Sequence, residues 1–175
     1  MISIRTFFSY LATFGLLLTL AMGSAYGETD QGGPDGGSAS ADIVTVAKQS
    51  GRYTTFLNLL EKAGMTDKLH ADGPYTVFMP TDEAFSQLSQ KDHDRLFNLP
   101  DESLKRFMNY QIVGGLVPTN EMSDTQHLQA LYQQISITKK GDGIKVNDAN
   151  IVEPDIKANN GIIHGIDKVI EPFFE

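Results

Sequence analysis

The sequence contains no cysteine. Because disulfide bonds are therefore absent, the hydrophobic core alone must stabilise the fold. In an exported protein, this composition fits the bacterial cell envelope better than a small eukaryotic secreted domain. The chain also has no Asn-X-Ser/Thr site for glycosylation. Without a cysteine after the amino-terminal apolar run, a lipid-anchored protein is excluded.

Motifs for catalysis and metal binding are also missing. The chain has neither a G-x-S-x-G nor an H-E-x-x-H sequence. His70, His93 and His127 lie in polar surroundings without a second histidine at metal-binding spacing. The acidic residues between positions 142 and 155 do not follow the calcium-loop pattern. We therefore expect no cofactor, no metal ion and no enzymatic activity.

Positive charge is scarce. The chain has 14 Lys and Arg residues against 22 Asp and Glu residues, which gives a formal net charge of −8 at pH 7. Nucleic acids and anionic lipid surfaces attract proteins with an excess of positive charge. Nucleic acid is therefore not expected as a partner, and a membrane is expected only if the amino-terminal apolar segment stays attached.

The amino-terminal residues have the charged, apolar and small-residue order of a secretory signal. Arg5 precedes an apolar run that is short for a membrane span, and small residues follow it. We expect residues 1–27 to be a signal peptide that is cleaved, with an uncleaved anchor as the alternative. Residues 28–41 are rich in Gly, Ser and Asp and predict a flexible tether. The folded domain is then residues 42–175, in the periplasm, at the cell surface or outside the cell.

Helical patterns dominate the first half of this domain. Ile43, Val46 and Ala47 share one helical face, and a second apolar face ends before Gly64, a residue suited to a C-terminal cap. A later helical pattern at residues 101–109 passes into a short apolar run before a Gly-Gly turn. These segments predict helices that pack against a common core.

Residues 73–85, GPYTVFMPTDEAF, predict a strand followed closely by a helix. Pro80 ends the β-prone run because it cannot donate a hydrogen bond to a neighbouring strand. Thr81 or Asp82 can then cap the helix, and Phe85 lies on its expected packing face. Capping and packing therefore account for this corner without any catalytic role.

Apolar residues alternate from about residue 133 onward, which predicts strands. Gly-Asp-Gly and Asn-Asn-Gly sequences separate these strands and are typical of turns. Helices therefore gather in the first half and strands in the second, an order that does not fit alternating βαβ units. We expect an antiparallel α+β domain.

Three motifs stand in order at domain spacing: GPYTVFMPTDEAF, MNYQIVGG and NNGIIHGIDKVIEP, with the hairpin sequence GDGIKVNDANIVEPDI before the last. Together they resemble the fasciclin (FAS1) domain family over residues 42–172. The resemblance implies a wedge-shaped antiparallel β-sandwich with helices packed along one side, found in secreted or surface proteins that mediate adhesion and matrix contact. It implies no catalysis and no cofactor.

The resemblance also assigns structural roles to five residues. The first family motif contributes Thr81, Asp82 and Phe85, and the terminal strand contributes His164 and Asp167. His164 alternates with apolar neighbours, so we interpret it as a buried, hydrogen-bonded histidine. A hydrolase that uses His164 is a third hypothesis, which requires a Ser or Asp side chain within hydrogen-bonding reach.

One departure from the family pattern concerns Tyr110 and Gln111. Animal adhesion members carry a Tyr-His pair here that is tied to integrin contact, so integrin binding is not expected for this chain. Tyr110 itself is either a buried structural residue with its hydroxyl bonded to the backbone or a recognition residue at the surface.

Partner binding is expected in the less regular region of residues 110–131. Tyr110, Leu116 and Val117 are the candidate recognition residues. The leading hypothesis is an exported, monomeric, non-enzymatic binding module for adhesion or surface attachment. Its partner is expected to be a protein or surface polymer at the cell envelope or a host surface. The alternative is a small-molecule or lipid carrier with a cavity between sheet and helices.

Overall fold

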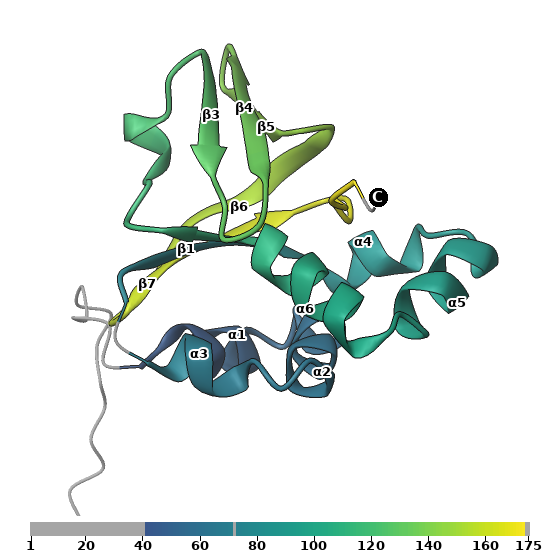
Figure 1. Ribbon diagram of the computed structural model, residues 1–175. Coiled ribbons are helices and arrows are strands. Elements are labelled where there is room, and N and C mark those ends of the chain that lie inside the picture. Colours follow the sequence, from purple (N-terminus) through teal and green to yellow (C-terminus); the bar gives the residue numbers. More distant parts are fainter. Residues whose placement is uncertain (1–40, 72, 174–175) are drawn as a thin grey trace, which may run out of the picture. The chain divides into compact units, whose positions relative to one another are not determined.

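The computed structural model describes residues 41–71 and 73–173. Helices dominate the first half of this part and strands the second (Figure 1). The order confirms the predicted α+β class. The elements are α1 (Ile43–Ser50), α2 (Thr54–Lys62), α3 (Thr66–His70), β1 (Tyr75–Pro80), α4 (Asp82–Ser86), α5 (Gln90–Phe97), α6 (Asp101–Tyr110), β2 (Ile112–Gly114), the 3₁₀ turn η1 (Thr119–Glu121), β3 (Thr125–Gln129), β4 (Gln134–Lys140), β5 (Gly143–Val146), β6 (Ala149–Ala158) and β7 (Gly161–Ile166).

Local capping sets the ends of α1 and α2. The Asp42 side chain accepts a hydrogen bond from the Thr45 N–H at 2.8 Å at the start of α1. Gly64 follows α2 with a φ of 65°, a left-handed conformation that glycine adopts without steric cost. The predicted C-terminal cap at Gly64 is therefore confirmed.

The corner after β1 uses its two capping residues for two different helices. Thr81 caps α4 by accepting a hydrogen bond from the Ala84 N–H at 3.2 Å. Asp82 instead caps α2, where its carboxylate accepts hydrogen bonds from the Thr55 N–H at 2.7 Å and the Thr54 hydroxyl at 2.7 Å. Burial raises the pKa of the Asp82 carboxyl, but these hydrogen bonds bring it below its ordinary value.

The seven strands form one sheet in the order β2-β1-β7-β6-β5-β4-β3. Every neighbouring pair is antiparallel except β1 and β7, which run parallel from Tyr75 opposite Gly161 to Pro80 opposite Ile166. The predicted antiparallel arrangement is therefore observed for every pair except this one. Because almost the whole domain separates β1 from β7, their pairing leaves no local signal such as a hairpin turn.

Strands β1 and β7 are covered on both faces. Val77 and Met79 of β1 and Ile163 of β7 pack into the cluster formed with the helices. Phe78 and Ile166 point the opposite way into a second cluster, which also contains residues of β4 and β5. Figure 1 shows the helices on one side of these two strands and β3, β4 and β5 on the other. Double coverage explains why β7 is buried along its full length.

Two glycines of β7 allow the helical segment to approach closely. A Cβ atom at Gly161 would lie 2.6 Å from Ile43 Cδ1, and one at Gly165 would collide with the Tyr53 hydroxyl. That hydroxyl is hydrogen-bonded to Glu153 of β6. Burial raises the pKa of Tyr53 to about 12.

The sheet folds back on itself around the second cluster. Register shifts interrupt the pairing of β6 with β7 between Ile151 and Ile156, and such irregularities bend a strand. The two ends of the sheet meet where Leu131 N–H donates to Ile112 O at 2.8 Å and where Val113 and Ala130 form an isolated bridge. This folding confirms a sandwich-like arrangement with helices along one side.

Helices α3 and α5 and strand β3 were not predicted from the sequence. Helix α5 buries only Leu96, so its apolar periodicity is weak. Strand β3 lies at an end of the sheet, and its residue sequence TQHLQ contains a single apolar side chain, Leu128. Both elements form because neighbouring segments hold them, and single-sequence patterns do not record such contacts.

The predicted signal peptide, residues 1–27, and nearly all of the predicted tether, residues 28–41, lie outside the described residues. Within residues 41–71 and 73–173, none of the helices combines the length and apolar character that crossing a bilayer requires.

Candidate recognition site

The connection that leads from β2 to the first residue of η1, residues 115–119, carries two of the three predicted recognition residues. Leu116 has 53% of its surface exposed, whereas Val117 is half-buried and packs against the second cluster. The Thr76 hydroxyl of β1 donates to Gly115 O at 2.8 Å and accepts from Val117 N–H at 3.0 Å. The backbone on both sides of Leu116 is thus fixed, while Leu116 itself is exposed.

His164 holds the same connection from β7. Its Nε2 lies 2.9 Å from Val117 O, and its Nδ1 accepts a hydrogen bond from the Asp155 N–H at 3.2 Å. Since Nδ1 accepts, Nε2 must carry the proton and donate it to Val117 O. The ring is fully buried and stacks on Phe78 with centroids 5.4 Å apart.

Both nitrogens of His164 therefore bind main-chain atoms, and among the described residues neither bonds a Ser or Asp side chain. The contact that the hydrolase hypothesis requires is thus not seen in this part of the chain. Burial lowers the pKa of His164, which favours the neutral ring that this hydrogen-bond pattern requires. The structure thus places His164 as a support for residues 115–119.

Asp155 of β6 adds a third support. Its carboxylate accepts hydrogen bonds from the Thr119 N–H at 2.9 Å and from the Thr119 hydroxyl. Asp155 has a φ of 56°, a left-handed conformation that Asp adopts more readily than most residues. Burial raises the pKa of the Asp155 carboxyl, but the bonds from Thr119 bring it below its ordinary value.

Thr76, Thr119 and Asp155 were not predicted from the sequence as supports of this connection. Thr119 and Asp155 are separated by 36 residues in the chain, and Thr76 and Val117 by 41. Contacts over such separations follow from the tertiary fold. Ordinary turn and strand residues carry them, so the sequence contained no motif that would have identified them.

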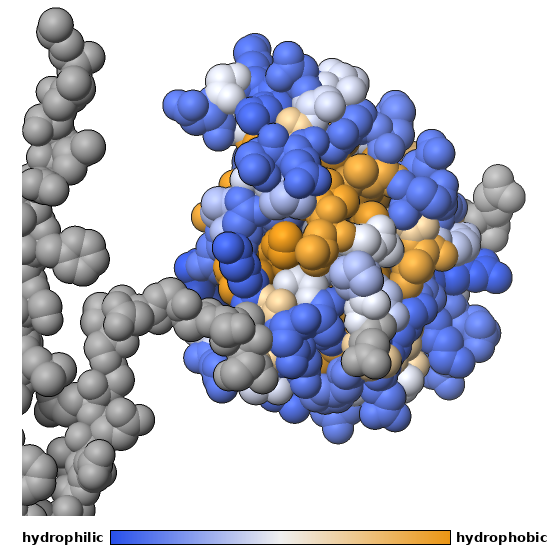
Figure 2. Space-filling view, turned by 90° about the vertical axis from the view of Figure 1, so that its left-hand side faces the viewer, coloured by the Kyte–Doolittle hydropathy of each residue, from blue (hydrophilic) through white to orange (hydrophobic). Residues whose placement is uncertain are grey.

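Leu116 lies at the edge of a surface hollow of about 850 Å³. The hollow is also lined by Pro74, Lys157 and the hydrogen-bonded side chains of Asp42 and His70, whose Oδ2 and Nδ1 atoms are 2.8 Å apart. Figure 2 views the molecule from the side of the connection between β2 and β3. Apolar side chains gather in the middle of that face, with hydrophilic residues around them. An apolar centre with a polar rim is the usual composition of a protein-binding surface.

Tyr110 does not suit the role of an exposed recognition residue. Only 3% of its surface is exposed, because its ring packs into the second cluster. Its hydroxyl accepts a hydrogen bond from Asn147 Nδ2 at 2.9 Å and lies 3.4 Å from Gln134 O. The recognition site predicted from the sequence is therefore reduced to Leu116, with Val117 fixing the backbone beside it.

The remaining family-motif residues lie within the fold. Phe85 is buried in the helical cluster. Asp167 follows β7 and accepts hydrogen bonds from Asn150 N–H at 2.7 Å and Asn150 Nδ2 at 2.6 Å. With Thr81 and Asp82 acting as helix caps, none of these side chains is left available for recognition.

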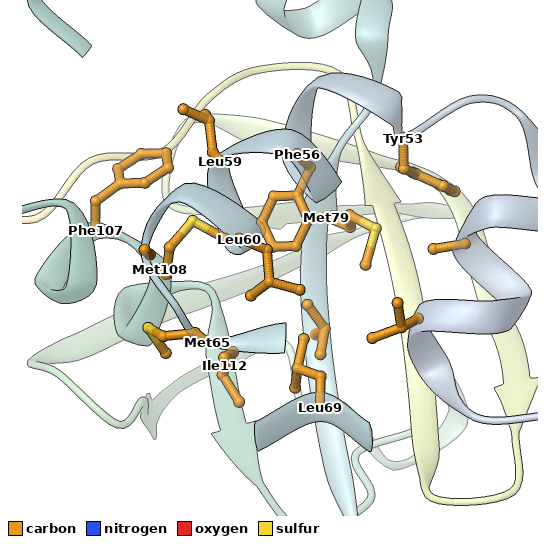
Figure 3. Packing of buried hydrophobic residues seen from close by; sticks show 14 of the residues in the cluster. Tyr53, Phe56, Leu59, Leu60, Met65, Leu69, Met79, Phe107, Met108 and Ile112 are labelled. Carbon is orange, nitrogen blue, oxygen red and sulfur yellow. The ribbon is translucent and has the colours of Figure 1, made fainter. Parts of the chain in front are cut away.

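The space between sheet and helices, where a carrier would need its cavity, contains packed side chains. Phe56, Leu60, Met79, Phe107 and Met108 are fully buried there. Figure 3 shows these side chains facing one another between α2, α6 and β1. Over the described residues, no three His, Asp or Glu side chains are grouped to hold a metal ion.

Comparison with known proteins identifies the family. The profile of the fasciclin domain matches residues 51–172, well over half of the chain. The chain therefore belongs to the fasciclin domain family, and the resemblance noted in its motifs is confirmed.

Two relatives and one solved structure illustrate the match. Protein sll1735 of Synechocystis sp. is 33% identical over 130 residues, covering 74% of this chain and 96% of the relative. The immunogenic protein MPB70 of Mycobacterium bovis is 31% identical over 140 residues, covering 76% of this chain and 70% of the relative. A FAS1 domain pair from the insect cell adhesion molecule fasciclin I has a similar fold, with a TM-score of 0.65 at 16% identity. The match covers 77% of this chain and 52% of that structure, so the chain spans about half of its length.

Proposed function

We propose that this protein is an exported, non-enzymatic binding module that works in adhesion or surface attachment. The observation that carries the proposal is the connection of residues 115–119, which fixed hydrogen bonds hold in place while it presents the exposed Leu116. A rigid backbone lowers the entropy that binding must overcome. An apolar side chain beside a hollow with a polar rim suits a contact residue.

The family supports the same proposal. The solved structure with a similar fold belongs to a molecule described as an insect cell adhesion molecule. We propose that the partner here is a protein or a surface polymer at the cell envelope or a host surface. Residues 1–27 would direct export as a signal peptide, residues 28–41 would form a tether, and the domain of residues 42–175 would act as a monomer.

The packed interior supports a binding surface over a carrier. Small-molecule carriers enclose most of their ligand in a concave cavity. Burying a ligand between α2 and β1 would require displacing side chains such as Phe56 and Met79, both fully buried. An exposed surface needs no such rearrangement.

An attachment assay tests the proposal. Beads coated with the purified protein are applied to the surface of the producing cells or of a host, and the retained beads are counted. The Leu116→Ser variant should reduce retention to near the level of uncoated beads, whereas Leu131→Ser should not. Leu131 is a matched control because 42% of its surface is exposed and it lies outside the hollow beside Leu116. Equal retention by folded Leu116→Ser and parent protein would contradict the proposal.

A further inference from the structure

A second hollow lies on the part of the sheet formed by β3 and β4. Its volume of about 520 Å³ falls within the range of about 300–1,000 Å³ found for small-molecule sites. Its lining combines amide, hydroxyl and imidazole side chains with one aromatic residue near the carboxyl end of the described chain. The residues that matter for its chemistry are Tyr110, His127, Gln134, Ser136, Asn147 and Phe173.

The Tyr110 hydroxyl at this hollow donates only a long hydrogen bond. Asn147 Nδ2 donates to the hydroxyl oxygen at 2.9 Å. The acceptor available to the hydroxyl proton, Gln134 O, is 3.4 Å away, well beyond the usual distance of about 2.7–2.8 Å between two oxygens. Only 3% of the surface of Tyr110 is exposed, so the position of its ring, and with it that of the hydroxyl oxygen, is fixed. A ligand oxygen in the hollow would be a better acceptor.

The neighbouring polar groups are held in place. Asn147 Oδ1 accepts from the Ser136 N–H at 2.9 Å, and Asn147 N–H donates to Ser136 O at 2.7 Å. The Asn147 side chain therefore keeps a fixed orientation between β4 and Tyr110. The Ser136 hydroxyl and the Gln134 amide, which also line the hollow, both donate and accept hydrogen bonds.

Phe173 provides an exposed aromatic surface beside these groups. Its side chain belongs to a residue with 82% of its surface exposed. Its backbone is fixed because Gln133 Nε2 donates to Phe173 O at 2.9 Å and Phe173 N–H donates to Gln133 Oε1 at 3.2 Å. A large apolar ring held in solvent beside a polar hollow is typical of a binding surface rather than of a core.

The charges at the hollow select against anions. Asp148 and Glu171 both line it. Glu171 accepts two hydrogen bonds from Arg95, at 2.8 and 2.9 Å, and Asp148 lies 3.5 Å from Lys168 Nζ. Among the described residues that line the hollow there are two carboxylates and no Lys or Arg, so an anionic ligand would meet negative charge there. A neutral ligand meets no such repulsion.

We infer that this hollow binds a neutral saccharide unit of a surface polymer. The face of a pyranose ring is apolar and packs on an aromatic ring such as Phe173, while its hydroxyl groups both donate and accept hydrogen bonds. Tyr110, Ser136 and Asn147, which line the hollow, carry groups that match these hydroxyls. The inference goes beyond the proposed attachment through Leu116 and does not depend on it.

Titration by two-dimensional ¹H–¹⁵N NMR tests this inference. The probes are cellotriose, maltotriose and triacetylchitotriose, each added to the full-length protein in millimolar excess. At least one should shift the amide signals of Ser136, Asn147 and Phe173 in a saturable way. Heparin fragments, which are anionic, should not shift them.

Four variants locate the site. Tyr110→Phe removes only the hydroxyl and should weaken saccharide binding about two- to tenfold, as expected for one hydrogen bond. Phe173→Ala should weaken binding about tenfold. Leu131→Ala is the matched control for an exposed apolar residue, and Leu116→Ser is the control for the attachment surface, so neither should change the affinity.

Three results would overturn the inference. They are the absence of saturable shifts with all three neutral probes, unchanged affinity in both Tyr110→Phe and Phe173→Ala, and an equal response to the heparin fragments. The spectrum of each variant also shows whether it is folded. Loss of saccharide binding with intact Leu116-dependent attachment, or the reverse, separates this inference from the proposed function.

Discussion

Replacing His164 by alanine should destabilise the protein because it removes the support of residues 115–119. The change leaves Val117 O without its donor and the Asp155 N–H without its acceptor. A buried polar group left without a partner costs about 1–3 kcal/mol, so two would cost about 2–6 kcal/mol. Both bonds are only partly buried, so water can hydrogen-bond the groups left without partners and reduce this cost. We expect a decrease in the free energy of unfolding of about 2–4 kcal/mol.

Urea denaturation followed by far-ultraviolet circular dichroism measures this loss. The His164→Gln variant is the matched control, because glutamine retains one donor and one acceptor on a side chain of similar length. It should lose clearly less stability than His164→Ala. A loss below about 0.5 kcal/mol for His164→Ala, the level of an ordinary surface substitution, would refute the reasoning that His164 supports residues 115–119.

Three further predictions concern the fold. Phe85→Ala and Ile166→Ala should each lower the free energy of unfolding by about 2–5 kcal/mol in the same denaturation assay, because both side chains are buried; losses near surface levels would mean that they are exposed. Asp82→Ala should cost about 1–2 kcal/mol through the lost cap of α2, and amide hydrogen exchange should rise in the first turn of α2, whereas unchanged exchange would argue against this cap. Since the folded pKa of His164 lies below its ordinary value of 6.5, the unfolded state binds more protons below that pH. The contribution of the neutral His164 to the free energy of unfolding should therefore be fully present above pH 6.5 and fall as the pH decreases below it. An equal pH dependence in His164→Gln would contradict this assignment.

The sequence predicted those parts of the fold that local rules determine. The helices that contain Ile43 and Phe56 have clear apolar periodicity, and Gly64 and Thr81 are capping residues whose roles depend on nearby atoms. The strands around the Gly-Asp-Gly and Asn-Asn-Gly turns also follow from local patterns. Such features need only a few neighbouring residues, so a single sequence contains them.

Contacts between distant segments could not be predicted in this way. Thr81 or Asp82 was expected to cap α4, and Thr81 does so, whereas Asp82 caps α2. Asn160 was recognised only as a turn residue, yet its side chain bonds Leu69 O at 2.8 Å and the Ile43 N–H at 2.9 Å. The parallel pairing of β1 with β7 belongs to the same group. In each case the partner is chosen by the tertiary fold, which local propensity does not determine.

Only part of the candidate site was predicted, because its supporting contacts also join distant segments. The sequence identified Leu116 as an apolar residue in an irregular segment, and the structure adds that this segment is held by Thr76, Asp155 and His164. It also shows that Tyr110 is 3% exposed and yet lines a surface hollow. Amphipathic side chains such as tyrosine leave this distinction open until their surroundings are known.

Site-specific cross-linking at position 116 tests most directly whether Leu116 contacts the partner. Because the chain has no cysteine, Leu116→Cys and Leu131→Cys each create a single thiol that can carry a benzophenone photo-cross-linker. Each labelled protein is bound to the attachment surface and irradiated, and cross-linked products are counted by gel electrophoresis. The proposal predicts a discrete cross-linked product from position 116 and little or none from position 131. Equal cross-linking at the two positions, or none at position 116 during full attachment, would contradict it.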